Sequence, residues 1–363
     1  MSMVWKLGVN IMKDIIEIIS NQKFLSAVLS TLIVVMISFC LRRKNIIKDN
    51  ARKVVADIVL KLALPAMAFN AFMSDFNRSE AKSTLQVFFF GLGMYLLMIF
   101  GLKLLFKYTF KSIPEKTKQV FQIVIIFGNV TFFTFPIVAD LYGDVASIPG
   151  QIMILVFRIF AYSYAFFTMA GIKVDKEHIG NTVKSIIFNP IVVCTFIGLI
   201  IWLTQDFLPT VNVNGVDVSI LRFDKSLPAV YPFVKYLSNM CTPLSWVLIG
   251  LTIGEATIGE AFKSKSAWFL ALGRTIAIPA IALALIVLLQ FVGITNVSKY
   301  GFIACVLMLA SPLSVVINTY SVKYDRDSYL VSDVCFLSTI LGIVTVPMFI
   351  VIVEIISKTA LFA

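Results

Sequence analysis

Apolar runs of about 20 residues recur along the chain, and they decide what it can fold into, because that is the length a helix needs to cross a bilayer. They begin at residue 24 and continue to the C-terminus. Hydrophobic residues make up 59% of the chain and charged residues 14%, with a mean hydropathy of +0.93, far from the balance of a soluble protein. The runs are continuous, whereas the strands of a membrane β-barrel alternate apolar and polar residues. The sequence therefore predicts an all-α polytopic membrane protein.

The runs predict ten transmembrane helices, an even number that places both termini on the same side of the membrane. Their expected bounds are 24–41, 54–74, 85–106, 120–141, 151–171, 182–205, 234–254, 266–292, 300–322 and 330–356. Lysine and arginine concentrate in the loops after the odd-numbered spans, whereas the loop 142–150 carries neither. The positive-inside rule then predicts a multi-pass protein of the cell membrane with both termini extracellular.

The formal net charge of +11 comes mainly from lysines and arginines in these loops. Such loops face anionic lipid headgroups, so we expect membrane lipids and no nucleic acid as partners. Five cysteines lie singly in apolar runs and form no CxxC pair, which argues against a disulfide framework or a zinc site. The only histidine, His178, lies in an expected cytoplasmic loop. With no Walker motif and no nucleophile–base cluster, the sequence predicts a protein that is not an enzyme and needs no metal or cofactor.

Two of the expected spans contain a helix breaker. The fourth carries Asn129 and Pro136, and the ninth carries Pro312 and Asn318. Proline removes a backbone hydrogen bond, and in lipid the freed carbonyl must find another partner, so such breaks are tolerated mainly where they line a cavity. We expect two discontinuous helices that meet at a substrate site, with half-helices beginning after the two prolines.

The two halves of the chain share one plan. Pro65 and Pro136, in the second and fourth spans, are 71 residues apart, and Pro243 and Pro312, in the seventh and ninth, are 69 apart. Because each half has five spans, the second half enters the membrane from the opposite side, as in the inverted repeats of secondary transporters. The expected organisation is a first repeat over 24–171, a linker with the sixth helix over 172–205, and the rest of the second repeat over 234–363.

Two segments lie outside this repeat. Residues 1–23 alternate apolar and charged side chains at helical spacing, a pattern typical of an amphipathic helix that lies in the membrane interface. The segment 206–233 is expected to be an external loop. Its valines alternate around Asn214 and Gly215, which favours a small β-hairpin over a disordered loop.

Six short motifs follow one another along the chain. They are LALP at 62–65, GN(x6)P(x5)YG at 128–143, FNP(x6)IGL at 188–199, LS(x11)G at 237–250, SP(x11)Y at 311–324 and ST(x7)P at 338–347. In this order the chain resembles the auxin efflux carrier family, and more closely its bacterial malate-permease-like members, since it lacks a long loop between helices five and six. The resemblance implies ten helices in two inverted five-helix repeats. It also implies that helices four and nine break and cross at their prolines and bind an organic anion there.

The resemblance and the helix breaks together indicate a set of substrate-binding candidates. The motifs of the crossing helices match Asn129, Pro136, Pro312 and Asn318. Neutral hydrogen-bonding side chains nearby complete the set of candidates: Asn129, Thr131, Thr134, Pro136, Ser311, Pro312, Ser314 and Asn318. Thr134 departs from the family, which usually has a smaller residue two positions before that proline. The alternative is that these polar groups only satisfy backbone groups freed by the breaks.

Charged residues within apolar spans are costly and are candidates for function. Arg158 could attract the anion, and Asp333 could carry a proton. Lys61 and Asp140 flank the two prolines of the first half and complete the candidate set of coupling or anion-attracting charges. For each of them, local pairing is the alternative.

The leading interpretation is a secondary transporter that moves a small carboxylate, such as malate or a related acid, by alternating access, either with protons or as a uniport. A cation/proton antiporter of similar architecture and a non-transporting membrane sensor are the alternatives. The expected partners are the organic anion, protons and lipids, and a homodimer stays open.

Overall fold

The computed structural model describes residues 22–48, 50–76, 78–171, 180, 184, 187–213, 215–255 and 258–362. Nearly all of the interfacial helix expected at 1–23, and much of the linker after residue 171, lie outside these residues. Within them, seven helices are long and apolar enough to cross a membrane: Ala51–Ala71, Ala81–Thr109, Val145–Ala170, Pro190–Phe207, Pro232–Gly254, Lys265–Phe291 and Ser328–Ser357. The chain is therefore an all-α polytopic membrane protein, while the count of ten spans and the inverted repeat stay predictions.

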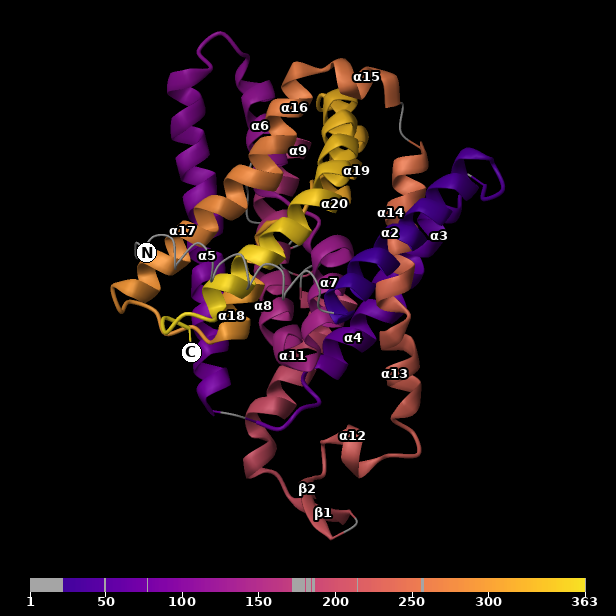
Figure 1. The fold of residues 1–363 in the computed structure, drawn as a ribbon, viewed down its shortest axis with the longest axis vertical. Helices are drawn as coiled ribbons and strands as arrows, with labels where there is room; N and C mark the ends of the chain where they lie inside the picture. Colours follow the sequence, from indigo (N-terminus) through magenta and orange to yellow (C-terminus); the bar gives the residue numbers. More distant parts are fainter. Residues whose placement is uncertain are drawn as a thin grey trace, which may run out of the picture.

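The helices fall into two bundles, and each half of the chain contributes to both (Figure 1). The first bundle contains α2 (Gln22–Arg43), α3 (Ala51–Ile58), η1 (Val59–Ala63), α4 (Leu64–Ala71), α11 (Pro190–Thr204), α13 (Pro232–Asn239) and α14 (Cys241–Glu255). The second contains α5 (Arg78–Thr109), α6 (Glu115–Ile126), η2 (Val130–Thr134), α7 (Phe135–Tyr142), α8 (Asp144–Phe160), η3 (Ala161–Ala165) and α9 (Phe166–Ala170). It is completed by α16 (Lys265–Leu272), η5 (Gly273–Ala277), α17 (Ile278–Phe291), α18 (Lys299–Leu309), α19 (Val315–Lys323) and α20 (Ser328–Ser357), and α15 (Ile258–Lys263) lies beside α20.

Packing between elements defines the bundles and their boundary. In the first bundle α14 packs along α2, and α4 packs between α11 and α13. In the second, α8 packs against α5, α7 and α18, and α20 packs against α16 and α18. The two bundles meet where α14 contacts η2 and α7, and where α2 contacts α7. The interrupted fourth span therefore lies at the boundary.

Three of the helices widen into a π-helical turn before a proline. The segments η1, η2 and η5 each end two residues before Pro65, Pro136 and Pro279, and each proline lies in the first turn of the α-helix that follows. Proline has no N–H, and its ring clashes with the carbonyl four residues earlier, which in each case belongs to the π segment. The wider turn accommodates the proline without ending the helix.

A hairpin and a short helix, α12 (Phe223–Ser226), cover one end of the first bundle (Figure 1). The strands β1 (Thr210–Val213) and β2 (Val216–Ser219) pair antiparallel within the segment where the sequence predicts a hairpin. Gly215 begins the return with a φ of 83°, a conformation that glycine adopts without steric cost.

One buried arginine ties this cap to the connection between α4 and α5. Arg222 binds both carboxylate oxygens of Asp224 at 2.8 Å, and its Nη1 donates to Asp75 Oδ1 at 2.6 Å. Lys225 also donates to Asp75, at 2.9 Å. The hydrogen bonds from Lys225 and Arg222 lower the pKa of the Asp75 carboxyl below its ordinary value. The start of the chain segment that links the two bundles is thereby fixed to the first bundle.

We expect Arg222→Met to destabilise this cap by about 2 kcal/mol, because the partly buried Asp224 carboxylate loses a bidentate partner. The matched control is Lys225→Met, which removes an exposed ion pair and should cost less than about 1 kcal/mol. Thermal unfolding of the purified variants measures both, and an equal fall in Tm would contradict this ranking.

The pH dependence of the same cap follows from Asp75. A carboxyl whose pKa is lower in the folded state stabilises the fold above its unfolded pKa of about 3.9, and this stabilisation is lost as pH falls through the folded value. We therefore expect the Tm difference between the wild type and Asp75→Asn to stay constant from pH 8 to about pH 5. A difference that vanishes near neutral pH would contradict it.

Candidate functional site

The fourth and ninth spans are both interrupted, and the interruptions pair with each other. The backbone N–H of Asn129 donates to the carbonyl of Pro312 at 2.6 Å, and the N–H of Ser314 donates to the carbonyl of Phe127 at 3.0 Å. These bonds form an isolated antiparallel bridge centred on Gly128 and Leu313. We call the paired segments 127–129 and 310–314 the crossing. Two segments that lie far apart in sequence thus satisfy each other's freed backbone groups, as a membrane interior requires.

The two prolines have different positions relative to the crossing. Pro312 lies within its break, and α19 begins just after it at Val315, as expected. The expectation that a half-helix begins after Pro136 is wrong, because η2 already begins at Val130 and Pro136 lies in the first turn of α7. The π turn absorbs that proline, so the fourth span breaks around Gly128 instead.

Two of the predicted residues cap the half-helices that leave the crossing. Asn129 Oδ1 accepts a hydrogen bond from the N–H of Phe132 at 3.4 Å, and Ser314 Oγ accepts one from the N–H of Val316 at 3.3 Å. Both side chains are buried. Because the breaks are paired, the N-terminal ends of η2 and α19 lie close together, and each carries the partial positive charge of a helix N-terminus.

The opposite helix ends meet at Arg274, a residue of η5 with no solvent exposure. Its Nη1 donates to the carbonyls of Ile125 and Ile126 at 3.1 and 2.8 Å, at the C-terminus of α6. Its Nη2 donates to the carbonyl of Leu309 at 2.8 Å, at the C-terminus of α18. The remaining bonds, from Nε and Nη2, reach the carbonyl and hydroxyl of Ser311 at 2.8 and 3.1 Å. One guanidinium therefore caps both helix C-termini.

Arg274 is absent from the residues that the sequence indicated. The signal was present, since it is a lone arginine inside the apolar span Lys265–Phe291, and charges in such spans are candidates for function by default. Its role was not visible in the sequence, because its acceptors lie 35 to 149 residues away along the chain.

The other neutral candidates are distributed around the crossing. Thr131 and Thr134 are buried in η2, and Thr134 Oγ1 lies 3.4 Å from the carbonyl of Val130. Asn318 lies further along α19 and is half-buried, and its side-chain oxygen accepts a hydrogen bond from Ser332 at 3.1 Å. Thr131, Thr134 and Ser311 thus lie beside the paired breaks, whereas Asn318 faces α20.

The charged candidates do not gather at the crossing. Asp140 is exposed on α7, and Asp333 is half-buried on α20. Arg158 is buried on α8, where its Nη1 donates to Tyr162 and Asn189. Neither partner of this arginine is a residue of the crossing.

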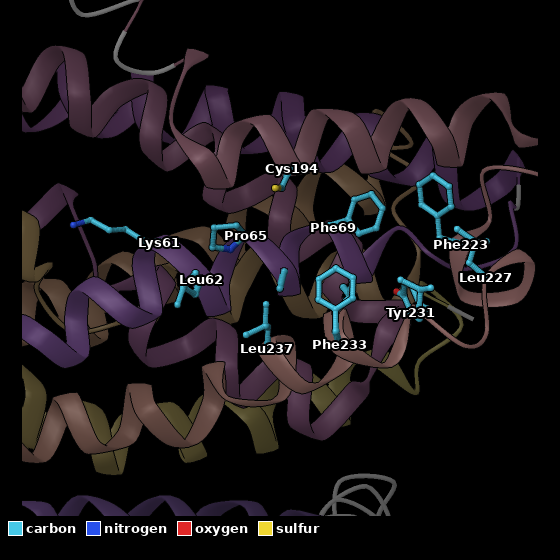
Figure 2. Close-up of a pocket in the computed structure, with 13 residues that line it drawn as sticks. Lys61, Leu62, Pro65, Phe69, Cys194, Phe223, Leu227, Tyr231, Phe233 and Leu237 are labelled. Carbon is cyan, nitrogen blue, oxygen red and sulfur yellow. The ribbon is translucent and has the colours of Figure 1, made fainter.

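Lys61 belongs to a different region. Its ammonium lies 3.1 Å from the Asp57 carboxylate, and both side chains are exposed. It borders a pocket of about 480 Å³ on the first bundle, between α4, α11 and α13. Figure 2 shows Lys61 at one end of this pocket and Phe223 at the other. The pocket is lined mainly by apolar side chains and includes no crossing residue.

Buried hydrogen-bond donors without a partner in the described part of the chain lie on α5 and α14, helices that contact the interrupted fourth span. Tyr95, on α5, stacks on Phe160 with ring centroids 5.2 Å apart, and its ring lies tilted against that of Phe127 at 5.7 Å. Its hydroxyl is buried and has no hydrogen-bond partner among the described residues. The same holds for the indole N–H of Trp246, on α14, the helix that packs on η2. A buried donor without an acceptor costs about 1–3 kcal/mol, so this arrangement is suited to receive an acceptor from a ligand.

Both breaks, both caps and Arg274 fall within the region matched by a sequence profile for a membrane transport protein family, which covers residues 23–350. The chain belongs to this family. It is the auxin efflux carrier family that the motifs resemble. The chain is also 23% identical over 335 residues to an uncharacterized transporter of Methanocaldococcus jannaschii, MJ1031, covering 89% of this chain and 97% of that protein. Membership in a transporter family implies a role other than catalysis.

Gly128 lies in the crossing at a position with no room for a side chain. A Cβ atom there would lie 2.0 Å from Ser311 Oγ and 2.2 Å from Arg274 Nη2. We expect Gly128→Ala to lower Tm sharply or prevent folding, because both neighbours are held by several hydrogen bonds and cannot move cheaply. Gly93→Ala is the control, since a Cβ there meets nothing within 4 Å. Equal stability of the two variants, measured by thermal unfolding in detergent, would show that the crossing has room for a side chain at position 128.

Arg274→Lys tests the guanidinium separately from its charge. Lysine keeps the charge but has no planar fork, so carbonyls at the ends of α6 and α18 lose their donors, at about 1–3 kcal/mol each. We expect a large fall in Tm. Arg326→Lys is the control, because that arginine donates to the carbonyl of Met169, which is not a residue of the crossing. A variant Arg274→Lys as stable as this control would show that charge alone suffices.

Proposed function

We propose that this protein is a secondary transporter that moves a small organic anion, such as malate or a related carboxylate, across the cell membrane by alternating access. The observation that carries the proposal is that Arg274 caps the C-termini of both α6 and α18 at the crossing. The consequence is electrostatic.

A helix C-terminus carries about half a negative charge and a helix N-terminus about half a positive charge. Four helix ends meet at the crossing. The two C-termini together match the single positive charge of Arg274, so the N-termini at Asn129 and Ser314 are left with about one positive charge in total. A bound monoanion or one carboxylate of a diacid would complete the balance.

The same charges disfavour a cation at this site. The candidate side chains at the crossing are amides and hydroxyls, whereas a cation/proton antiporter needs acidic groups there. A cation would also face Arg274 in a medium of low dielectric constant. The groups at the crossing therefore favour the anion carrier over the antiporter. A membrane sensor of the same fold would differ in that it transports no substrate.

The position of the crossing supports alternating access. It belongs to the second bundle and lies where η2 and α7 contact α14 and α2 of the first bundle. Movement of one bundle against the other would expose the site to one side of the membrane at a time. The driving force would be a gradient of the anion alone or of protons with it, and the basic loops would face the cytoplasm, with both termini outside.

Counterflow into proteoliposomes tests the proposal. We expect vesicles loaded with unlabelled substrate to accumulate at least one labelled member of a panel of acetate, malonate, malate and indole-3-acetate. An imposed pH gradient should change the extent of uptake for a proton symporter and leave it unchanged for a uniporter. If none of these anions exchanges, the anion-carrier function is wrong.

Ser314→Ala tests whether the half-helix end binds the anion. We expect the KM for counterflow to rise about tenfold, which corresponds to about 1.4 kcal/mol of lost binding. Ser264→Ala is the matched control, because Ser264 caps α16 in the same way, accepting from the N–H of Ala267 at 3.2 Å. An equal effect of both variants would move the substrate site away from the crossing.

A further inference from the structure

Arg158 is a buried arginine that takes no part in the crossing. Its side chain is 2% exposed, on α8 of the second bundle. Its Nη1 donates to the Tyr162 hydroxyl at 3.0 Å and to Asn189 Oδ1 at 3.4 Å. Its Nε is buried and has no hydrogen-bond partner in the described part of the chain.

Both acceptors of Arg158 are neutral. No ion pair joins this guanidinium to a carboxylate among the described residues, in contrast to Arg222, which has two acidic partners. A buried positive charge without a counter-charge is strongly unfavourable, and so is a buried N–H without an acceptor. The edge of the guanidinium that includes Nε is the one suited to bind a carboxylate with two parallel hydrogen bonds.

The guanidinium lies at the N-terminus of α11. Asn189 is the N-cap of this helix, and its side-chain oxygen also accepts from the N–H of Ile191 at 3.1 Å. The α11 helix has 15 residues and begins with Pro190, so its first turn carries the partial positive charge of a helix N-terminus. Because α11 belongs to the first bundle, the contact between Arg158 and Asn189 spans the boundary between bundles.

The chain around Arg158 is also irregular. The π-helical segment η3 begins three residues after it and contains Tyr162. Such single-turn π segments occur frequently at functional sites. Unlike η1, η2 and η5, η3 precedes no proline, so proline does not explain it. The Tyr162 hydroxyl accepts from Arg158 and still has its own proton to donate.

We propose that Arg158, Tyr162 and Asn189 form a second carboxylate-binding site, separate from the crossing and located between the two bundles. The carboxylate binds the Nε edge of Arg158, which Tyr162 and Asn189 hold in place through Nη1, and the N-terminus of α11 adds a favourable field. The proposal rests on the proposed function for the class of ligand, because the site would take the same small carboxylates. Because the second site lies between the bundles, it would bind the anion on its way between the crossing and one side of the membrane.

Equilibrium binding to the full chain in lipid nanodiscs tests this site. The probe is whichever of labelled acetate, malonate, malate and indole-3-acetate the wild type binds most tightly. We expect two anions per wild-type chain and one per Arg158→Met chain. The control Arg326→Met removes an arginine whose side chain donates to the backbone carbonyl of Met169, and this variant should keep two. The double variant Asn129→Ala, Ser314→Ala should keep the Arg158 site and lose the site at the crossing.

Two further variants guard against a folding defect in Arg158→Met. Arg158→Lys keeps the charge without the fork, and Tyr162→Phe removes one hydroxyl, so each should weaken the second site at least tenfold while the first is unchanged. The proposal is overturned if these variants bind the wild-type number of anions with wild-type affinity, or if the wild type binds none of the four. Failure of the proposed function looks different. In that case no anion crosses liposomes, yet one bound anion still disappears in Arg158→Met.

Discussion

The structure depends on how the backbone at the crossing is satisfied without water. Breaking two helices inside a membrane frees carbonyls that lipid cannot hydrogen-bond. Arg274 supplies donors to the ends of α6 and α18, while the two breaks pair with each other around Gly128. Removing either component would leave several buried backbone groups without partners at once. The close approach of the arginine to Gly128 explains why a residue without a side chain is needed there.

This constraint connects the fold to the proposed function. The arginine that stabilises the breaks also neutralises the negative helix ends, so the positive ends at Asn129 and Ser314 remain for a ligand. The crossing lies against the first bundle, whose α11 presents Asn189 to the buried Arg158. Both proposed sites are thus built from helix N-termini, and both lie where the bundles contact each other. In a membrane interior, helix N-termini can bind an anion without many buried lysines or arginines.

Hydropathy, prolines and turn residues predicted much of the fold from the sequence. Long apolar runs predicted the membrane class, Pro312 marked the break before α19, and Gly215 lies where the hairpin turns. Local sequence signals did not predict features that depend on contacts between distant segments. Pro136 looked like the break of the fourth span, but a π turn accommodates it, and the break follows the pairing of Gly128 with Leu313. The hydrogen bonds of Arg274 to α6 and α18, and that of Arg158 to Asn189, join segments far apart in the sequence, so no local pattern predicts them.

The central claim is that the helix ends at Asn129 and Ser314 bind a carboxylate. Anomalous diffraction from crystals soaked with a bromine-substituted carboxylate, chosen because it competes in counterflow, tests this most directly. We expect a bromine peak beside the crossing, with the carboxylate next to the caps of η2 and α19. A fully occupied bromine peak elsewhere, such as in the apolar pocket near Lys61, with no density at the crossing, would contradict it.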